Sequence, residues 1–106
     1  MKHHMEEEKG VLTVHITGDV DHHSAAQLRQ SIDARLTESD TVHTLRLALG
    51  ETDFMDSSGL GLILGRLRLA RERGVRLVLA QPTPAIRKIL RLAGVEKDIE
   101  TEGEAV

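Results

Sequence analysis

Two serines and an aspartate stand together in the stretch Asp56-Ser57-Ser58, directly before a glycine-rich run that starts at Gly59. The apolar periodicity that follows predicts a helix over about residues 58–73, so these polar side chains lie where that helix begins. Aspartate and serine are common N-caps, because their oxygens accept hydrogen bonds from the unpaired N–H groups of the first turn. Capping is therefore the simplest interpretation of these residues.

The same position is also suited to a phosphorylated serine. A helix N-terminus carries roughly half a positive charge and presents free N–H donors, so it stabilises an anion. A phosphate adds about −1.5 to −2 charges, which the helix start would attract and the neighbouring Asp56 would repel. Phosphorylation here is compatible with the fold and changes the surface sharply, as a switch for partner binding requires. The residues alone leave capping and phosphorylation both open.

Gly59, Gly61 and Gly65 need a separate explanation, because a glycine inside a helix costs on the order of 1 kcal/mol relative to alanine. A dinucleotide-binding fingerprint is one candidate, since the run follows a strand and opens a helix. However, the spacing is Gly-x-Gly-x-x-x-Gly, and no acidic residue ends the next strand, where Gln81 and Pro82 lie. We therefore expect no cofactor. The glycines should instead let the helix approach the sheet, or let a partner approach the serine.

A serine hydrolase is another alternative, with Ser57 or Ser58 as nucleophile and His22 or His23 as base. The chain has no Gly-x-Ser-x-Gly elbow, and nothing in the sequence brings a histidine next to either serine. We therefore expect no intrinsic catalysis, and the protein is not expected to be an enzyme.

The histidines raise the question of a metal site. Neighbouring histidines in a strand or loop point to opposite faces, and no cysteine or carboxylate cluster completes a tetrahedral set. Asp19 and Asp21 form an Asp-x-Asp pair, which is more typical of a turn than of a magnesium site. We expect exposed loop histidines and no bound metal; the histidines are His3, His4, His15, His22, His23 and His43.

Composition and charge exclude several classes of protein. The chain has 106 residues, 40% hydrophobic and 29% charged, which is ordinary for one globular domain. Its net charge of −3 and its aromatic content of 1% do not suit binding to nucleic acid or to an anionic membrane. No run approaches about 18 apolar residues, and the start of the chain lacks a signal-peptide core. We expect a cytoplasmic protein.

The elements that position these residues alternate between strand and helix. Strands at period two and helices with apolar stripes at a spacing of three and four predict an α/β domain with parallel pairing. The charged segment 2–8 suits an edge strand. The expected order is a strand at 11–17, a helix at 24–36, a strand at 45–49, a helix at 58–73, a strand at 77–80, a helix from Thr83-Pro84 to Gly94 and a short strand at Ile99.

Local details follow from the same patterns. Gly18-Asp19 is expected to break the first strand, and Ser24 with Gln27 fits a capping box. Residues 50–55 are expected to form a connection that delivers Phe54 and Met55 into the core.

On the helix at 58–73, the expected buried residues are Leu60, Ile63, Leu64 and Leu67, with Gly74 beyond the end. Leu62 and Leu69 are expected off this face, where they either widen the core contact or form an apolar patch that a partner covers, with a slight preference for the patch. The arginines of this helix are expected on a solvated face, at Arg66, Arg68, Arg71 and Arg73.

Residues 54–66, read together with residues 17–25, resemble the STAS-domain anti-sigma factor antagonists (sulfate transporter and anti-sigma factor antagonist). The Asp-Ser-Ser-Gly-Leu-Gly run is fairly specific to antagonists, and the Asp-His-His run narrows the resemblance towards the sporulation branch, the anti-sigma F factor antagonists. The resemblance covers about residues 11–99. It implies a single STAS domain over residues 1–106, with a mixed sheet of four to five strands and about three to four helices.

The resemblance implies a partner-switching mechanism. In this family the unphosphorylated antagonist binds an anti-sigma factor that is also a serine kinase with bound ATP, and a sigma factor is released. The kinase then phosphorylates the antagonist, which dissociates, and a PP2C-type phosphatase resets it. The family's phosphorylated serine falls on Ser58. The matching neighbours and partner-binding positions are Asp21, His22, His23, Asp56, Ser57, Gly59, Leu60, Gly61 and Leu62.

The end of the chain departs from the family pattern, because a shortened tail at 102–106 stands where the family continues into another helix. A monomer is expected. The alternative function is a non-phosphorylated STAS scaffold or regulatory subunit of a transporter or stress-signalling complex. Neighbouring genes for a kinase and a sigma factor would favour the switch, and transporter genes would favour the scaffold.

Overall fold

The computed structural model of the chain describes residues 1–103. Within these residues, five strands form one sheet, accompanied by three α-helices and one short 3-10 helix. This confirms the predicted α/β class. In chain order the elements are β1 (Lys2–Glu8), β2 (Val11–Val20), α1 (His22–Glu38), β3 (Thr44–Met55), α2 (Ser57–Arg73), β4 (Arg76–Ala80), α3 (Pro84–Leu92), η1 (Glu96–Asp98) and β5 (Glu100–Glu102).

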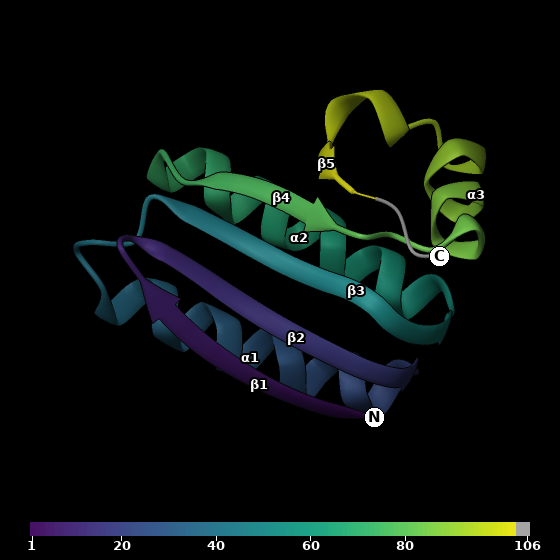
Figure 1. Cartoon of the computed structure of the whole chain (residues 1–106), viewed down its shortest axis with the longest axis horizontal. Coiled ribbons are helices and arrows are strands. Elements are labelled where there is room, and N and C mark those ends of the chain that lie inside the picture. The colour runs from purple at the N-terminus through teal and green to yellow at the C-terminus, as the bar shows by residue number, and fades with distance from the viewer. Residues whose placement is uncertain (104–106) are drawn as a thin grey trace.

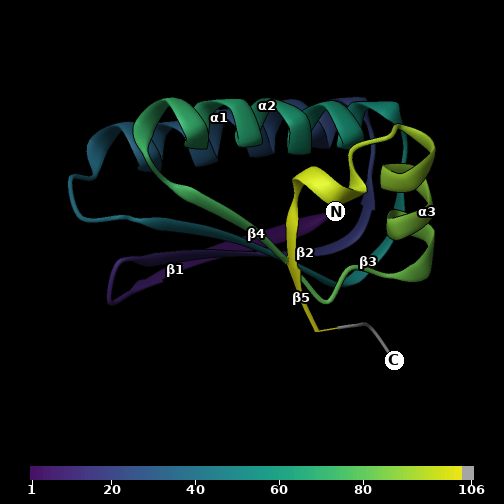
Figure 2. The ribbon, with the colours of Figure 1, turned by 90° about the horizontal axis from the view of Figure 1, so that it is seen from above.

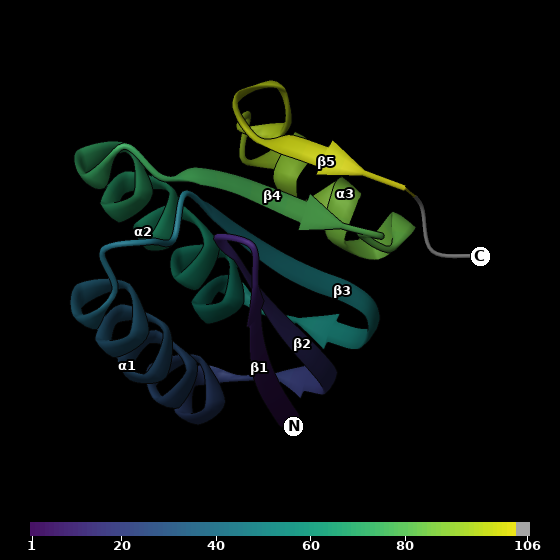
Figure 3. The ribbon, with the colours of Figure 1, turned by 60° about the vertical axis from the view of Figure 1, so that its left-hand side comes forward.

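The strands lie in the sheet in the order in which they occur in the chain, β1-β2-β3-β4-β5 (Figure 1). β1 pairs antiparallel with β2 as the predicted edge strand, and every other neighbouring pair is parallel. α1 and α2 lie side by side over one face of the sheet, as Figures 2 and 3 show. Because no helix of the described residues covers β1 and β2 on their other face (Figure 2), that face is open.

The core lies between the sheet and the pair α1 and α2. Side chains alternate along a strand, so every second residue of β2 and β3 faces these helices. Burial of an aliphatic side chain stabilises the fold by about 1.5–3 kcal/mol, and nearly the whole core is aliphatic. Its fully buried members include Leu12, Val14, Ile16, Leu28, Ile32, Leu45, Leu47, Leu49, Ile63 and Leu79.

Two strands run further than the sequence predicted. β2 does not break at Gly18-Asp19 but continues to Val20, because Gly18 adopts a φ of 91° where the register with β3 shifts. Residues 50–55 are the second half of β3 and not a connection. Since neighbouring side chains point to opposite faces, Met55 is buried while Phe54 is 58% exposed. The expectation that both enter the core was therefore wrong for Phe54.

α1 begins two residues earlier than predicted. Its N-cap is Asp21, whose Oδ1 accepts a hydrogen bond from the backbone N–H of Ser24 at 2.9 Å. Ser24 Oγ in turn accepts from the backbone N–H of Asp21, also at 2.9 Å. The capping box is thus formed by Asp21 and Ser24, and the predicted pair Ser24 and Gln27 was wrong by one turn.

The second half of the chain follows the prediction closely. Gly74 ends α2 in the left-handed region with a φ of 68°, and Thr83 caps α3 through the N–H of Ile86. Ile99 is buried just before β5. Glu102 is the last residue of β5, so the tail that was predicted at 102–106 does not begin at Glu102. The rest of that predicted tail lies largely outside the described residues.

Candidate functional site

The carboxyl ends of β2 and β3 bring two helix N-termini together. Val20 lies opposite Met55 in the parallel register, and the backbone N–H of Asp56 donates to Val20 O at 3.4 Å. Asp21 and Asp56 follow these paired residues and cap α1 and α2 respectively. Each helix start carries roughly half a positive charge, which the carboxylates of Asp21 and Asp56 already offset in part.

Asp56 is the residue that caps α2. Its Oδ1 accepts hydrogen bonds from the backbone N–H groups of Ser58 at 2.8 Å and Gly59 at 3.3 Å. The capping interpretation therefore holds for the aspartate, and neither serine hydroxyl is used as a cap. Ser57 is exposed and Ser58 is half-buried at the start of the helix. Both hydroxyls are thus available for chemistry other than capping.

Ser58 lies next to a histidine, which the sequence did not predict. Its Oγ is 3.4 Å from Nδ1 of His22, the first residue of α1. The parallel pairing of β2 and β3 places the two helix starts side by side. Within residues 1–103, however, no carboxylate hydrogen-bonds to His22, and Ser58 has ordinary helical backbone instead of a strained elbow. The arrangement therefore lacks two features of a serine hydrolase.

A hollow of about 470 Å³ lies between the starts of α1 and α2, beside Ser58. Sequence reasoning missed one charged residue of its wall, Arg29, which is exposed. The sequence spacing could have indicated this position, because Arg29 follows His22 by two helical turns and so lies on the same face of α1. The hollow is lined by His22, Ala25, Ala26, Arg29, Ser58, Gly61 and Leu62.

The remaining predicted site residues differ in their accessibility. The His23 ring lies near the Gln27 side chain along α1, with 3.4 Å between their Nε2 atoms. Leu60 is half-buried, and Gly61 is exposed beside the hollow. Leu62 is only 4% exposed and packs in the core. For Leu62 the alternative of a wider core contact is therefore confirmed, and the slightly preferred exposed patch was wrong.

The buried face of α2 is rotated relative to the prediction. Leu60, Leu64 and Leu67 lie half-buried and pack against the margin of the core. The buried residues of α2 are Gly59, Leu62, Ile63, Arg66 and Ala70.

Arg66 lies inside the protein, not on the solvated face that was expected for it. Its side chain is 7% exposed, and its Nε lies 2.9 Å from Oδ1 of Asp33 on α1. Burial lowers the pKa of the Arg66 guanidinium, and the Asp33 carboxylate opposes that shift. This ion pair connects α1 to α2, the two helices that frame the hollow.

Only one of the three glycines of α2 is required by close packing. A Cβ on Gly59 would overlap Cγ and Sδ of Met55, the buried last residue of β3. Gly61 and Gly65 have no such neighbour within 4 Å of an added Cβ. The interpretation that the glycines let the helix approach the sheet is therefore right for Gly59 alone.

The Asp21 carboxylate is held in its charged form. The backbone N–H of Ser24, and then its hydroxyl, lower the pKa of Asp21 below the ordinary value of 3.8. The cap on α1 therefore remains ionised, and accepts hydrogen bonds, at any pH near neutrality.

The histidines lie mostly in regular elements and not in loops, contrary to the expectation. His22 and His23 belong to α1, while His43 precedes β3. His4 of β1 and His15 of β2 stack on each other across the two strands, with ring centroids 4.5 Å apart. Adjacent positions do point to opposite faces, but pairing between strands brings these two rings together.

Comparison with known proteins identifies the type of domain. The family described as STAS domain matches residues 2–105. The anti-sigma F factor antagonist of Paenibacillus polymyxa is 36% identical over 93 residues, which cover 88% of this chain and 79% of that protein.

Two solved structures have a similar fold and 29% sequence identity. The anti-sigma factor antagonist SpoIIAA in its unphosphorylated form has a TM-score of 0.84, covering 97% of this chain and 90% of that one. The Bacillus cell fate determinant SpoIIAA in the phosphorylated form has a TM-score of 0.78, covering 97% of this chain and 93% of that one.

In residues 1–103 no helix is long and apolar enough to cross a bilayer.

Proposed function

The chain belongs to the STAS domain family, and we propose that it is an anti-sigma factor antagonist whose switch is phosphorylation of Ser58. The unphosphorylated form binds an anti-sigma factor that is also a serine kinase with bound ATP, and this frees a sigma factor. Phosphorylation makes the antagonist dissociate, and a PP2C-type phosphatase restores it. The protein is a substrate of the kinase and not an enzyme. It acts as a monomer in the cytoplasm, without nucleic acid or membrane.

The observation that carries this proposal is the availability of the Ser58 hydroxyl. Asp56 satisfies the amides of the first turn, so phosphorylation of Ser58 removes no capping interaction. The hydroxyl lies beside an open hollow, where a kinase can reach it. A serine that was itself the cap would lose its hydrogen bond on modification, and the helix start would be destabilised.

The surroundings of Ser58 also suit the phosphorylated state. Two helix N-termini meet at this corner, and His22 and Arg29 lie on the wall of the same hollow. Arg29 is cationic, and His22 carries N–H donor capacity within reach of the serine. The phosphate would add about −1.5 to −2 charges beside the Asp56 carboxylate and make this surface strongly negative, while the fold beneath it stays intact. A partner that fits the unmodified surface would then be repelled.

Binding to the cognate ATP-loaded anti-sigma factor tests the proposal. Ser58→Ala should bind as tightly as the wild type and stay bound after ATP is added, because no phosphate can form. Ser58→Asp should bind at least about tenfold more weakly, a loss of roughly 1.4 kcal/mol. Ser57→Ala is the matched control, since it removes the neighbouring hydroxyl and should bind and release like the wild type.

Release of Ser58→Ala by ATP at the wild-type rate would contradict the proposal. Equal binding by all variants, with or without ATP, would also contradict it and would favour the alternative of a non-phosphorylated STAS protein.

A further inference from the structure

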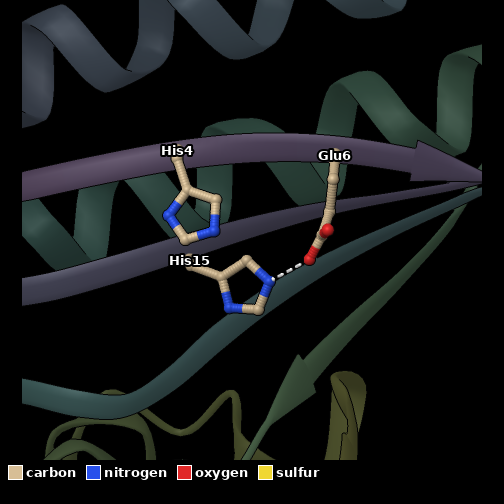
Figure 4. A group of neighbouring side chains, drawn as sticks. All are labelled: His4, Glu6 and His15. Atoms are coloured by element: carbon tan, nitrogen blue, oxygen red, sulfur yellow. Dashed lines mark hydrogen bonds and ion pairs between the residues drawn. The ribbon is translucent and has the colours of Figure 1, made fainter.

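Three potential metal ligands gather on the open face of the sheet, away from α1 and α2. His4 of β1 lies directly opposite His15 of β2, and Glu6 follows on the same side of β1 two residues later. Figure 4 shows the three side chains converging from the two strands. Their nearest ligand atoms all lie within 4.8 Å of one another.

The three side chains are close together, although the two rings are stacked and do not yet face a common point. The two imidazole rings stack with an interplanar angle of 13°, and Nε2 of His15 lies 2.7 Å from Oε1 of Glu6. A tetrahedral zinc ion with bonds of about 2.0–2.1 Å needs ligand atoms about 3.4 Å apart. Imidazole lone pairs lie in the ring plane, so one ring must turn out of the stack before both histidines can face one ion. His4 and Glu6 are exposed and His15 is half-buried, which leaves room for this turn. The ion then replaces the proton held between His15 and Glu6.

We propose that His4, Glu6 and His15 form a binding site for a divalent transition-metal ion, with Zn²⁺ as the natural occupant. Two imidazole nitrogens and one carboxylate oxygen are typical zinc ligands. Mg²⁺ and Ca²⁺ prefer sites made of oxygen atoms, so this donor set disfavours them. Three ligands from the protein leave the fourth position of the ion open.

A second observation shows space for that fourth ligand. A hollow of about 210 Å³ opens beside the two rings on the same face of the sheet. Water fits there, and a further carboxylate, Glu51, lies in its wall. The lining residues are His4, His15, Thr17, Ala48, Gly50, Glu51 and Gln81.

A bound ion would stabilise the edge of the sheet. Among the strands of residues 1–103, β1 pairs with β2 alone, and the proposed ligands come from both of these strands. An ion held by both strands opposes their separation, so the backbone amides of β1 should exchange more slowly with solvent when zinc is present. The site is separate from Ser58. Met5, which lies between His4 and Glu6 on β1, packs against the core, so the alternation of side chains places His4 and Glu6 on the opposite face of the sheet.

Calorimetric titration of the full chain with zinc chloride tests the site. The wild type should bind one ion saturably. His4→Gln and His15→Gln should each weaken that binding at least about tenfold, because the imidazole ligand is lost. Glu6→Gln should weaken it less, because an oxygen ligand, although a poorer one, remains at the same position.

Two histidines outside the cluster provide matched controls. His3→Gln changes the neighbouring residue of β1, which points to the opposite face, and His43→Gln changes a ring that already contacts Lys9 O and Thr44 Oγ1. Neither variant should alter zinc binding.

A measurement on the wild type removes any dependence on the folding of variants. On addition of zinc, imidazole NMR signals of His4 and His15 should shift together, while those of His43 should not. Absence of saturable binding, or binding that survives His4→Gln and His15→Gln, would overturn the proposal. Loss of binding in His3→Gln alone would also overturn it, since another site would then hold the ion.

Discussion

Ser58 Oγ lies 3.4 Å from Nδ1 of His22, although 36 positions separate the two residues in the chain. The contact exists because β2 and β3 run parallel and their last paired residues each lead into a helix. Carboxyl ends of parallel strands commonly build sites in this way. The serine hydroxyl thus lies between two helix starts, beside a histidine and an open hollow.

Arg29 is expected to stabilise the phosphorylated protein selectively. It lines the hollow beside Ser58, so Arg29→Ala should lower the unfolding free energy of the phosphorylated form by about 0.2–1 kcal/mol more than that of the unphosphorylated form. Urea unfolding of both forms measures this difference. Arg68→Ala is the control, because Arg68 is exposed and pairs with Glu72. An equal loss in both forms for Arg29→Ala would refute the role of Arg29.

Gly61 is expected to lower the stability of α2 and to keep the hollow accessible to a partner. Gly61→Ala should raise the unfolding free energy by about 0.5–1 kcal/mol, because its Cβ meets no atom within 4 Å. The added methyl group would project at the hollow and weaken binding of the anti-sigma factor. Gly65→Ala, one turn further along, should give the same stabilisation with unchanged affinity. Thermal unfolding and binding assays on both variants distinguish the two effects.

Gly59 is expected to be the glycine that the fold needs. Gly59→Ala should cost about 1–3 kcal/mol of unfolding free energy, because the new Cβ overlaps the buried side chain of Met55. In a Met55→Ala background the same change should cost less, since the overlapping atoms are gone. A double-mutant cycle by urea unfolding measures this coupling. Additive losses would show that the overlap does not set the cost.

The stability that the Asp21 cap gives to the protein is expected to depend on pH. Ser24 lowers the pKa of Asp21 in the folded state, so the ionised cap contributes stability above the ordinary value of 3.8. This contribution is lost as the pH falls through the lower folded pKa. The difference in unfolding temperature between the wild type and Asp21→Asn should therefore be constant above about pH 5 and shrink below pH 3.8. A difference that does not change with pH would contradict this assignment.

The order of strands and helices could be predicted because it depends on local periodicity. Alternation at Leu45 and Leu47 and the turn chemistry of Gly74 and Thr83 are local signals, and the structure confirms them. The exposure of Phe54 could not be predicted in the same way, because it depended on where β3 ends.

The candidate site depends on contacts between distant parts of the chain, so it was less accessible from sequence. Ser58 and Asp56 could be placed at a helix start from the sequence alone. The approach of His22 required the register between β2 and β3, and the pairing of His4 with His15 required that between β1 and β2. Burial of Arg66 depended on Asp33 of another helix, a partner that no local pattern indicates.

Mapping of the phosphate by mass spectrometry tests the central claim most directly. The wild-type chain is incubated with the cognate anti-sigma factor and ATP, and its intact mass and phosphopeptides are then measured. The account predicts one phosphate, carried by Ser58, which is absent from Ser58→Ala and present in Ser57→Ala. A phosphate on Ser57 or any other residue, or no phosphate at all, would contradict it.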